Sequence, residues 1–214
     1  MPFDRPAHSV SSAPVAAFDF DGTLSVGDSL QDFARYSLGR AGWLWAALRT
    51  VPALLAWRLG WGSRQQAKQV FLRACWGGQD GAVLQALGER YARERLPQLL
   101  RPEMLELVQQ HRALGHRLVL VSASPAFYLR PWALQAGFDA VLATELDLQG
   151  RFTAHLHTPN CWGPQKVERL AEWLQTEAVA LAYAYGDSRG DREMLACAQH
   201  PWLRGSGQPL PPLS

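Results

Sequence analysis

The chain has 214 residues, an apolar fraction of 48% and a formal net charge of +2. This length and this apolar content predict an ordered globular protein with one packed core and room for an insertion. The three cysteines are widely separated and odd in number, which argues against a disulfide framework and against a zinc site. A reducing cytoplasm is therefore the expected compartment, and nothing in so mild a basic balance predicts a nucleic-acid partner.

The two ends of the chain lack the periodicity of helices or strands. Residues 1–14 contain proline and serine but no apolar run of the kind that a secretory signal carries, so they predict a flexible tail. Residues 205–214 have a similar composition and predict a second flexible tail. Between them, no stretch of about eighteen uncharged apolar residues occurs, which argues against an ordinary transmembrane helix.

Four short apolar runs predict strands that are buried on both faces. They are Val15–Phe20, Arg117–Val121, Ala140–Ala143 and Ala180–Tyr185. Helical patterns at residues 101–115, 125–137 and 164–177 alternate with these strands, which predicts an α/β, Rossmann-like fold: a parallel sheet with helices on both faces. Residues 145–156 instead predict a short hairpin that turns at Gln149–Gly150.

Residues 28–99 carry no strand signal and separate the first predicted strand from the others. They predict an inserted helical unit, whereas residues 15–27 and 100–204 together predict the α/β core.

Polar side chains follow the predicted strands at the points where these strands end. Asp19 and Asp21 follow the first strand, Ser122 follows the second, and Asp187 with Asp191 follows the last, while Lys166 lies at the start of a helix between them. Because the carboxyl ends of parallel strands meet at one edge of a sheet, these side chains are expected to converge on one crevice.

A cluster of carboxylates is electrostatically unfavourable unless a cation accompanies it. Oxygen ligands of this kind suit Mg²⁺ better than zinc. A divalent cation together with Lys166 would neutralise a phosphoryl group, which is the main requirement of phosphoryl transfer. The sequence therefore predicts a magnesium-dependent site for a phosphorylated ligand.

Four segments carry a resemblance to a known family. In order and spacing, "DFDGT", "VSAS", Lys166 and "GDSRGD" resemble the four motifs of the haloacid dehalogenase-like (HAD) phosphohydrolases. The resemblance covers residues 15–26 and 100–200 and implies a Rossmann-like core with an inserted α-helical cap.

The resemblance also implies a role for each motif residue. Asp19 would be the nucleophile that forms an aspartyl phosphate, and Asp21 would protonate the leaving alcohol and later deprotonate water. Thr23 would fix the loop, and the phosphate would be bound by Ser122, Ala123 and Lys166. The expected magnesium ligands are Asp19, the main-chain carbonyl of Asp21, and Asp187, with Asp191 as a further ligand or a partner of a ligand. An acid at position 21 favours a phosphomonoester, because an alkoxide leaving group needs a proton and a halide does not.

The position of the insertion resembles the cap of subfamily IB, the phosphoserine phosphatase-like branch. In that branch an acidic residue seven positions after the acid-base Asp recognises the substrate amine, and Asp28 occupies this position here. The branch carries Asn just before the last motif Asp, where this chain has Gly190. Phosphoserine is therefore one candidate substrate among several.

Residues 33–79 contain seven basic side chains, five tryptophans and no Asp or Glu. This composition predicts a segment that lies at an interface and makes peripheral contact with an anionic membrane, on its inner face. It resembles the phosphatidylglycerophosphatase C group of the same subfamily, which implies a lipid phosphate such as phosphatidylglycerophosphate as the leading substrate. Alternatively, the tryptophans pack the cap and the arginines screen a soluble ester such as phosphoserine or histidinol phosphate.

Two further alternatives remain open. The chain could be a non-catalytic HAD-like module that binds a phosphorylated ligand or a membrane, or it could transfer the phosphoryl group to an alcohol other than water.

Overall fold

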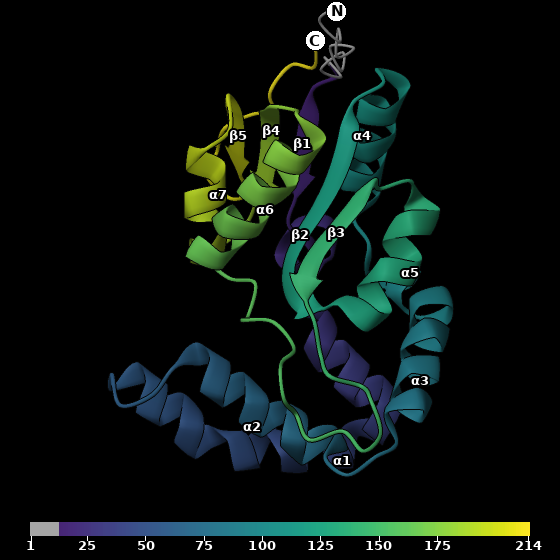
Figure 1. Cartoon of the computed structure of the whole chain (residues 1–214), viewed down its shortest axis with the longest axis vertical. Helices are drawn as coiled ribbons and strands as arrows, with labels where there is room; N and C mark the ends of the chain where they lie inside the picture. The colour runs from purple at the N-terminus through teal and green to yellow at the C-terminus, as the bar shows by residue number, and fades with distance from the viewer. Residues whose placement is uncertain (1–12) are drawn as a thin grey trace, which may run out of the picture.

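The structure is a computed structural model that describes residues 13–214. Five strands form one fully parallel sheet in the order β3-β2-β1-β4-β5 (Figure 1). Their bounds are β1 Val15–Phe18, β2 Arg117–Pro125, β3 Ala140–Thr144, β4 Leu181–Gly186 and β5 His200–Leu203. The four predicted strands are confirmed, and β5 is an edge strand that was not predicted, because its residues form no apolar run.

Helices cover both faces of the sheet, which confirms the predicted α/β fold class (Figure 1). Alternate residues of β1 point to opposite sides: Ala16 and Phe18 pack with α4 (Pro102–Ala113) and α5 (Ala126–Ala136). Val15 and Ala17 pack instead with α6 (Pro164–Glu177) and α7 (Arg192–Ala196). The central strand is therefore buried on both faces, which places its carboxyl end deep in the molecule.

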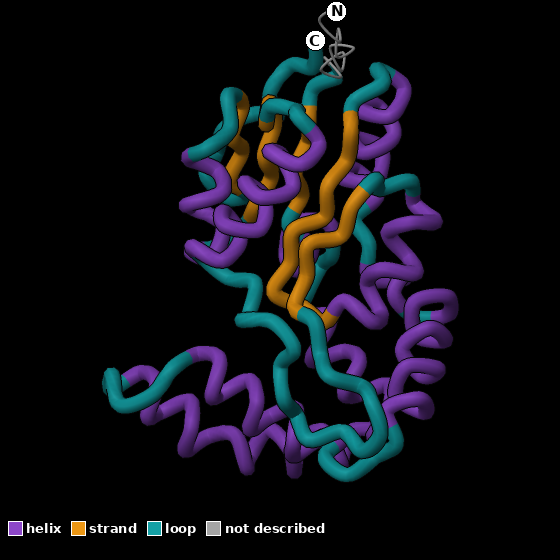
Figure 2. The backbone as a smooth tube through the Cα atoms, viewed as in Figure 1, coloured by secondary structure: helices purple, strands orange, loops and turns teal. Residues whose placement is uncertain are grey.

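Between β1 and β2 lies the helical insertion, which contains three helices and a 3-10 turn. Their bounds are α1 Ser29–Arg58, α2 Arg64–Trp76, α3 Gly81–Glu94 and the 3-10 turn Leu96–Leu99. Helix α1 is interrupted at Gly39, whose φ of +69° lies outside the helical region. Beyond this break, α1 and α2 pack as an antiparallel pair that projects from the core (Figure 2). The predicted absence of strands in this segment is confirmed, whereas its status as a separate domain stays a prediction.

The chain enters and leaves the insertion through two segments that lie side by side. The Val26 amide donates to the Leu99 carbonyl at 2.8 Å, and the Arg101 amide donates to the Leu24 carbonyl at 2.8 Å. Ser25 and Leu100 form an antiparallel bridge between these bonds. A short two-chain ribbon therefore joins the insertion to the core where the chain enters and leaves it.

A second connection joins the insertion to the segment that was predicted as a hairpin. Residues 145–157 form an irregular ribbon with a single bridge, Leu146 to Leu156, and a bend at Gln149–Gly150. Its tip pairs with the loop before α3: the Gly81 amide donates to the Gly150 carbonyl at 2.7 Å. In a regular hairpin, the backbone groups near the turn would form hydrogen bonds with each other. Here some of these groups form hydrogen bonds with the insertion instead.

The predicted N-terminal tail, residues 1–14, lies largely outside the described residues. Residues 205–214 were predicted to be a flexible tail, which stays a prediction; in the structure they are mostly exposed and contact the core at a few points. Trp202 Nε1 donates to the Gln208 carbonyl at 3.1 Å, and the Ser214 amide donates to the Tyr183 hydroxyl at 3.1 Å. Leu213 also packs against the core, and this single apolar contact is too isolated to produce a sequence pattern.

One histidine of α4 is completely buried against β4. His111 Nδ1 lies 2.8 Å from His116 Nδ1, and its Nε2 lies 2.8 Å from the Tyr185 hydroxyl. Burial, together with the neighbouring His116, lowers the pKa of His111 to about 4. The fold therefore keeps the His111 imidazole neutral near pH 6, where an imidazole in water would be partly protonated.

Candidate active site

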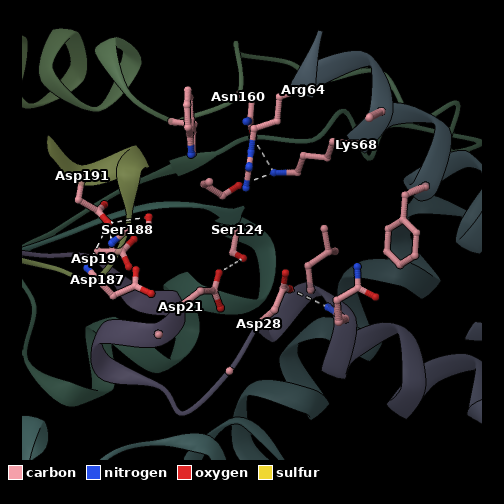
Figure 3. A pocket seen from close by; sticks show the side chains of 18 of the residues that line it. Asp19, Asp21, Asp28, Arg64, Lys68, Ser124, Asn160, Asp187, Ser188 and Asp191 are labelled. Carbon is pink, nitrogen blue, oxygen red and sulfur yellow. Dashed lines mark hydrogen bonds between the residues drawn. The ribbon is translucent and has the colours of Figure 1, made fainter. Parts of the chain in front are cut away.

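A cavity of about 780 Å³ lies between the carboxyl ends of β1, β2 and β4 and the helices α1 and α2 (Figure 3). Its core side carries carboxylates, including Asp19, Asp21 and Asp187. Its insertion side carries apolar and basic side chains, including Leu54 and Lys68. The cavity is thus acidic on the side of the sheet, and on the side of the helices it is lined by both apolar and basic side chains.

Asp19 is the first residue after β1 and is buried at the base of the cavity. One carboxylate oxygen accepts a hydrogen bond from Thr23 Oγ1 at 3.0 Å, and the other accepts one from Lys166 Nζ. Burial raises the pKa of Asp19 to about 7, against the opposing effect of the Lys166 ammonium. Thr23 does not line the cavity, and its hydroxyl contacts Asp19.

The chain turns sharply after Asp19 through the one-turn segment Phe20–Leu24. Gly22 in this turn has a φ of +80°, and a Cβ built there would lie 2.1 Å from Asp187 Oδ2. Glycine is therefore required for both the backbone conformation and the close approach of the two strand ends.

Asp21 points in a different direction from Asp19. Its Oδ1 accepts a hydrogen bond from the Ser29 amide at 2.6 Å, and its Oδ2 accepts one from the Ser124 hydroxyl (Figure 3). Burial, and then the charge of Asp28, raise the pKa of Asp21 to about 6. A carboxyl group with a pKa near neutrality can both give and take a proton under physiological conditions.

Lys166 is buried and lies between two carboxylates, since its Nζ also donates to Asp191 Oδ1 at 2.6 Å. Burial alone would lower the pKa of Lys166, but Asp19 and Asp191 outweigh it and raise this pKa. Asp191 Oδ2 accepts hydrogen bonds from the Ser188 amide and hydroxyl, both at 3.0 Å. Asp191 therefore holds Lys166 and the loop after β4 together.

Three carboxylates lie close enough to hold one metal ion. Asp19, Asp187 and Asp191 each offer an oxygen, and these oxygens lie within 4.8 Å of one another. Burial, and then the charge of Asp191, raise the pKa of Asp187, so the neighbouring ammonium does not offset all of the negative charge. An all-oxygen set with excess negative charge fits a hard divalent cation such as Mg²⁺. The Asp21 side chain does not belong to this group, as expected if only its carbonyl takes part.

The second motif is arranged differently from the prediction. Ser122 is fully buried and does not line the cavity, and its hydroxyl accepts a hydrogen bond from the Ser124 amide at 3.0 Å. Ala123 and Ser124 do line the cavity. The hydroxyl that contacts a carboxylate of the cavity, Asp21, is therefore that of Ser124, and the motif "VSAS" contains no signal that distinguishes its two serines.

The insertion contributes Asp28 and Lys68. Asp28 lines the cavity and caps α1 by accepting a hydrogen bond from the Gln31 amide at 2.9 Å. Lys68 Nζ donates to Asn160 Oδ1 at 2.8 Å and to the Ala123 carbonyl, so it joins α2 to the carboxyl end of β2 and to one loop of the core. Burial lowers the pKa of Lys68 to about 7. Lys68 was not predicted as a site residue, because its partners are distant in the sequence.

Comparisons with known proteins agree with this geometry. The chain is 36% identical to the protein CicA of Caulobacter vibrioides over 192 residues, which cover 89% of this chain and 85% of that protein. It is 28% identical to a probable phosphatase of Mycobacterium tuberculosis over 126 residues, 58% of this chain and 44% of that one.

Solved structures share the fold. A protein of unknown function from Bordetella pertussis matches with a TM-score of 0.72 and 28% identity over 87% of each chain. A substrate-bound phosphoserine phosphatase matches with a TM-score of 0.62 and 16% identity over 88% of this chain and 84% of that one. The model of the family described as haloacid dehalogenase-like hydrolase matches residues 16–196, a span that runs from β1 to the end of α7 and includes every carboxylate described above. The chain therefore belongs to the haloacid dehalogenase-like hydrolase family.

Proposed function

We propose that the chain is a Mg²⁺-dependent phosphomonoester hydrolase that acts through an aspartyl phosphate. The observation that carries this proposal is the separation of two carboxylates in one turn: Asp19 is bound by Lys166, whereas Asp21 is bound by Ser124 and Ser29. Two carboxyl groups with different partners can take different chemical roles. Membership of a hydrolase family and similarity to a probable phosphatase support the same conclusion.

In the first half of the proposed reaction, an oxygen of Asp19 forms a bond to phosphorus while the bond from phosphorus to the alcohol oxygen breaks. Asp21 gives its proton to the departing alkoxide. In the second half, Asp21 takes a proton from water, the water oxygen bonds to phosphorus, and the bond to Asp19 breaks. Inorganic phosphate leaves, and both carboxyl groups return to their starting states.

The other polar residues position these two groups. Thr23 and Lys166 fix the Asp19 carboxylate, and Lys166 is close enough to offset charge on the transferred phosphoryl group. Magnesium would be held by Asp19, Asp187 and the main-chain carbonyl of Asp21, with Asp191 as a further ligand or supporting group, and would neutralise the phosphoryl oxygens. Ala123 lines the same space and would contact the phosphate.

The helical insertion would act as the cap of this site, as in subfamily IB, because it lies between the first and second motifs and forms one wall of the cavity. Closure of such a wall would exclude water until the alcohol has left.

The assay is hydrolysis of an aryl phosphate in the presence of Mg²⁺. The Asp19→Asn variant should lose all activity, and Asp21→Asn should lose roughly 10²- to 10⁴-fold in kcat. Glu106→Gln, which changes an exposed acid of α4, is the matched control and should behave as the wild type. Activity that survives in Asp19→Asn would refute the assigned nucleophile, and activity that survives removal of Mg²⁺ by EDTA would refute the metal requirement. Absence of turnover in the wild type with any phosphate ester would favour a non-catalytic binding module.

As the substrate we propose a lipid phosphate such as phosphatidylglycerophosphate, which the chain would reach by peripheral contact with an anionic membrane from the cytoplasmic side. The supporting observation is the apolar wall that faces the catalytic carboxylates, formed by Leu30, Leu54, Trp57 and Phe71. Such a wall fits an alcohol with an apolar part.

The second candidate is a soluble metabolite with an amino group, such as phosphoserine or histidinol phosphate, which the position of Asp28 in the cavity favours. Values of kcat/KM for these two esters and for micellar phosphatidylglycerophosphate distinguish the candidates. The lipid should have the highest value, and a higher value for an amino ester would overturn the lipid assignment. Phosphate transfer to added alcohols, measured in the same assay, would identify a phosphotransferase.

A further inference from the structure

One face of α1 exposes a row of large apolar side chains to solvent. Leu44, Leu48, Val51 and Leu55 follow one another at helical spacing, and each is between 44% and 70% exposed. Side chains at this spacing lie on the same face of a helix. We call these four residues the outer face of α1.

Exposed apolar side chains are concentrated around this face. Of the fourteen large apolar side chains that are exposed in the described part of the chain, eight lie between residues 44 and 61. Trp61, at the turn between α1 and α2, is 82% exposed. An apolar surface of this extent on a folded protein indicates a site of contact.

The charge around the outer face has one sign. Arg40, Arg49 and Arg58 are exposed on the same helix, and residues 33–79 contain no Asp or Glu. The Arg49 guanidinium lies 4.5 Å from the centre of the Trp45 ring, so a cation and an aromatic side chain are presented together. The surface is therefore apolar along one line and basic at its borders.

These two properties decide which partner fits. In a symmetric dimer through this face, each arginine would meet arginines of the second copy with no nearby carboxylate on either segment, so a second copy fits poorly. None of the helices in the described residues is both long enough and apolar enough to cross a membrane. A helix with an apolar face and basic borders, too polar to cross a bilayer, is suited to lie along its surface.

We infer that the outer face of α1 binds the surface of an anionic lipid bilayer, with Arg40, Arg49 and Arg58 near the headgroups. Helix α1 would lie along the bilayer with its apolar side chains at the boundary between headgroups and acyl chains. Basic residues close to an anionic leaflet add to the attraction, and salt weakens their contribution.

This surface is connected to the candidate active site. Leu54 is 41% exposed and also lines the cavity, and Trp57 lines it one helical turn further along. An amphiphilic phosphate could therefore place its headgroup in the cavity while its apolar part stays at the bilayer surface. This connection to the substrate rests on the proposed function, whereas the binding of the outer face to lipid does not.

Sedimentation of the whole chain with vesicles tests the inference. The probes are vesicles of phosphatidylcholine with and without phosphatidylglycerol, at low and at high salt. The wild type should sediment with the anionic vesicles at low salt and much less at high salt. A Leu48→Asn/Leu55→Asn double variant should lose at least about tenfold in partitioning, and Arg49→Gln/Arg58→Gln should lose about fivefold per arginine.

The matched control is Leu114→Asn, which removes an exposed leucine at the end of α4, away from the insertion. It should partition as the wild type does, and unchanged thermal unfolding midpoints should show that all variants are folded. A wild type that does not sediment with anionic vesicles would overturn the inference. So would equal losses in Leu114→Asn and the double variant, or light scattering that shows a dimer which the double variant dissociates.

The outcome is independent of the proposed activity. Vesicle binding without hydrolysis of any phosphate ester would refute the enzyme assignment and leave the lipid-binding surface intact. Hydrolysis of micellar lipid phosphate without vesicle binding would refute the lipid-binding surface and leave the enzyme assignment intact.

Discussion

Replacement of Lys166 by Met tests the electrostatic balance of the site. The Lys166 ammonium is buried and contacts Asp19 and Asp191, whose carboxylates are also buried. Removal of one partner of a buried ion pair leaves an uncompensated charge and costs about 3–5 kcal/mol. With a urea dependence of about 2 kcal/mol/M, the unfolding midpoint should fall by roughly 2 M.

Equilibrium unfolding in urea, without added metal, measures this loss. Arg93→Met, which removes an exposed cation from α3, is the control and should change the free energy of unfolding by less than about 0.5 kcal/mol. In the double variant Lys166→Met/Asp191→Asn, one of the two carboxylates is also neutral, so the combined loss should be at least about 1 kcal/mol smaller than the sum of the single losses. A loss below about 1 kcal/mol in Lys166→Met, or strict additivity in the double variant, would refute the view that this ammonium stabilises the two carboxylates.

Three further predictions concern other parts of the structure. The folded-state pKa of His111, about 4, lies below its ordinary value of 6.5, so the unfolded chain takes up this proton first as the pH falls. The free energy of unfolding should therefore fall by about 3 kcal/mol between pH 6.5 and 4, and urea unfolding of His111→Gln should show a smaller decrease over that range. Lys68→Met should lower kcat/KM for the aryl phosphate, because Lys68 lines the cavity; a urea titration should show a loss of about 1–3 kcal/mol, because the buried Asn160 side chain loses a donor, and unchanged values of both would contradict the contact. Gly22→Ala should abolish hydrolysis, because its Cβ would overlap Asp187, and an active variant would show that the turn can move.

The positions of the clustered carboxylates could be predicted from the sequence because they depend on local pattern. Asp19 and Asp187 each follow an apolar run that forms a strand, and parallel strands end at a common edge. Ser124 and Lys68 could not be predicted in this way. Lys68 and its partner Asn160 are 92 residues apart, and their contact depends on how the insertion packs on the core. Strand β5 was missed for a related reason: it is short and partly exposed, and it is defined by its pairing with β4.

The two-chain ribbon that joins the insertion to the core has a consequence for how such a chain can change. Val26 is hydrogen-bonded to Leu99, and Leu24 to Arg101, so the two ends of the insertion lie side by side where they join the core. A tight turn would hold the two chain segments in the same way, and the number of inserted residues does not change this attachment. The entropic cost of closing a loop rises only slowly with the number of residues in it. A different inserted unit that begins and ends in the same ribbon would leave the strand order and the Asp19, Asp187 and Asp191 carboxylates in place, but it would have to replace the hydrogen bond that the Ser29 amide gives to Asp21. The inserted wall of the cavity is in this sense exchangeable, while the edge of the sheet that carries the three carboxylates is not.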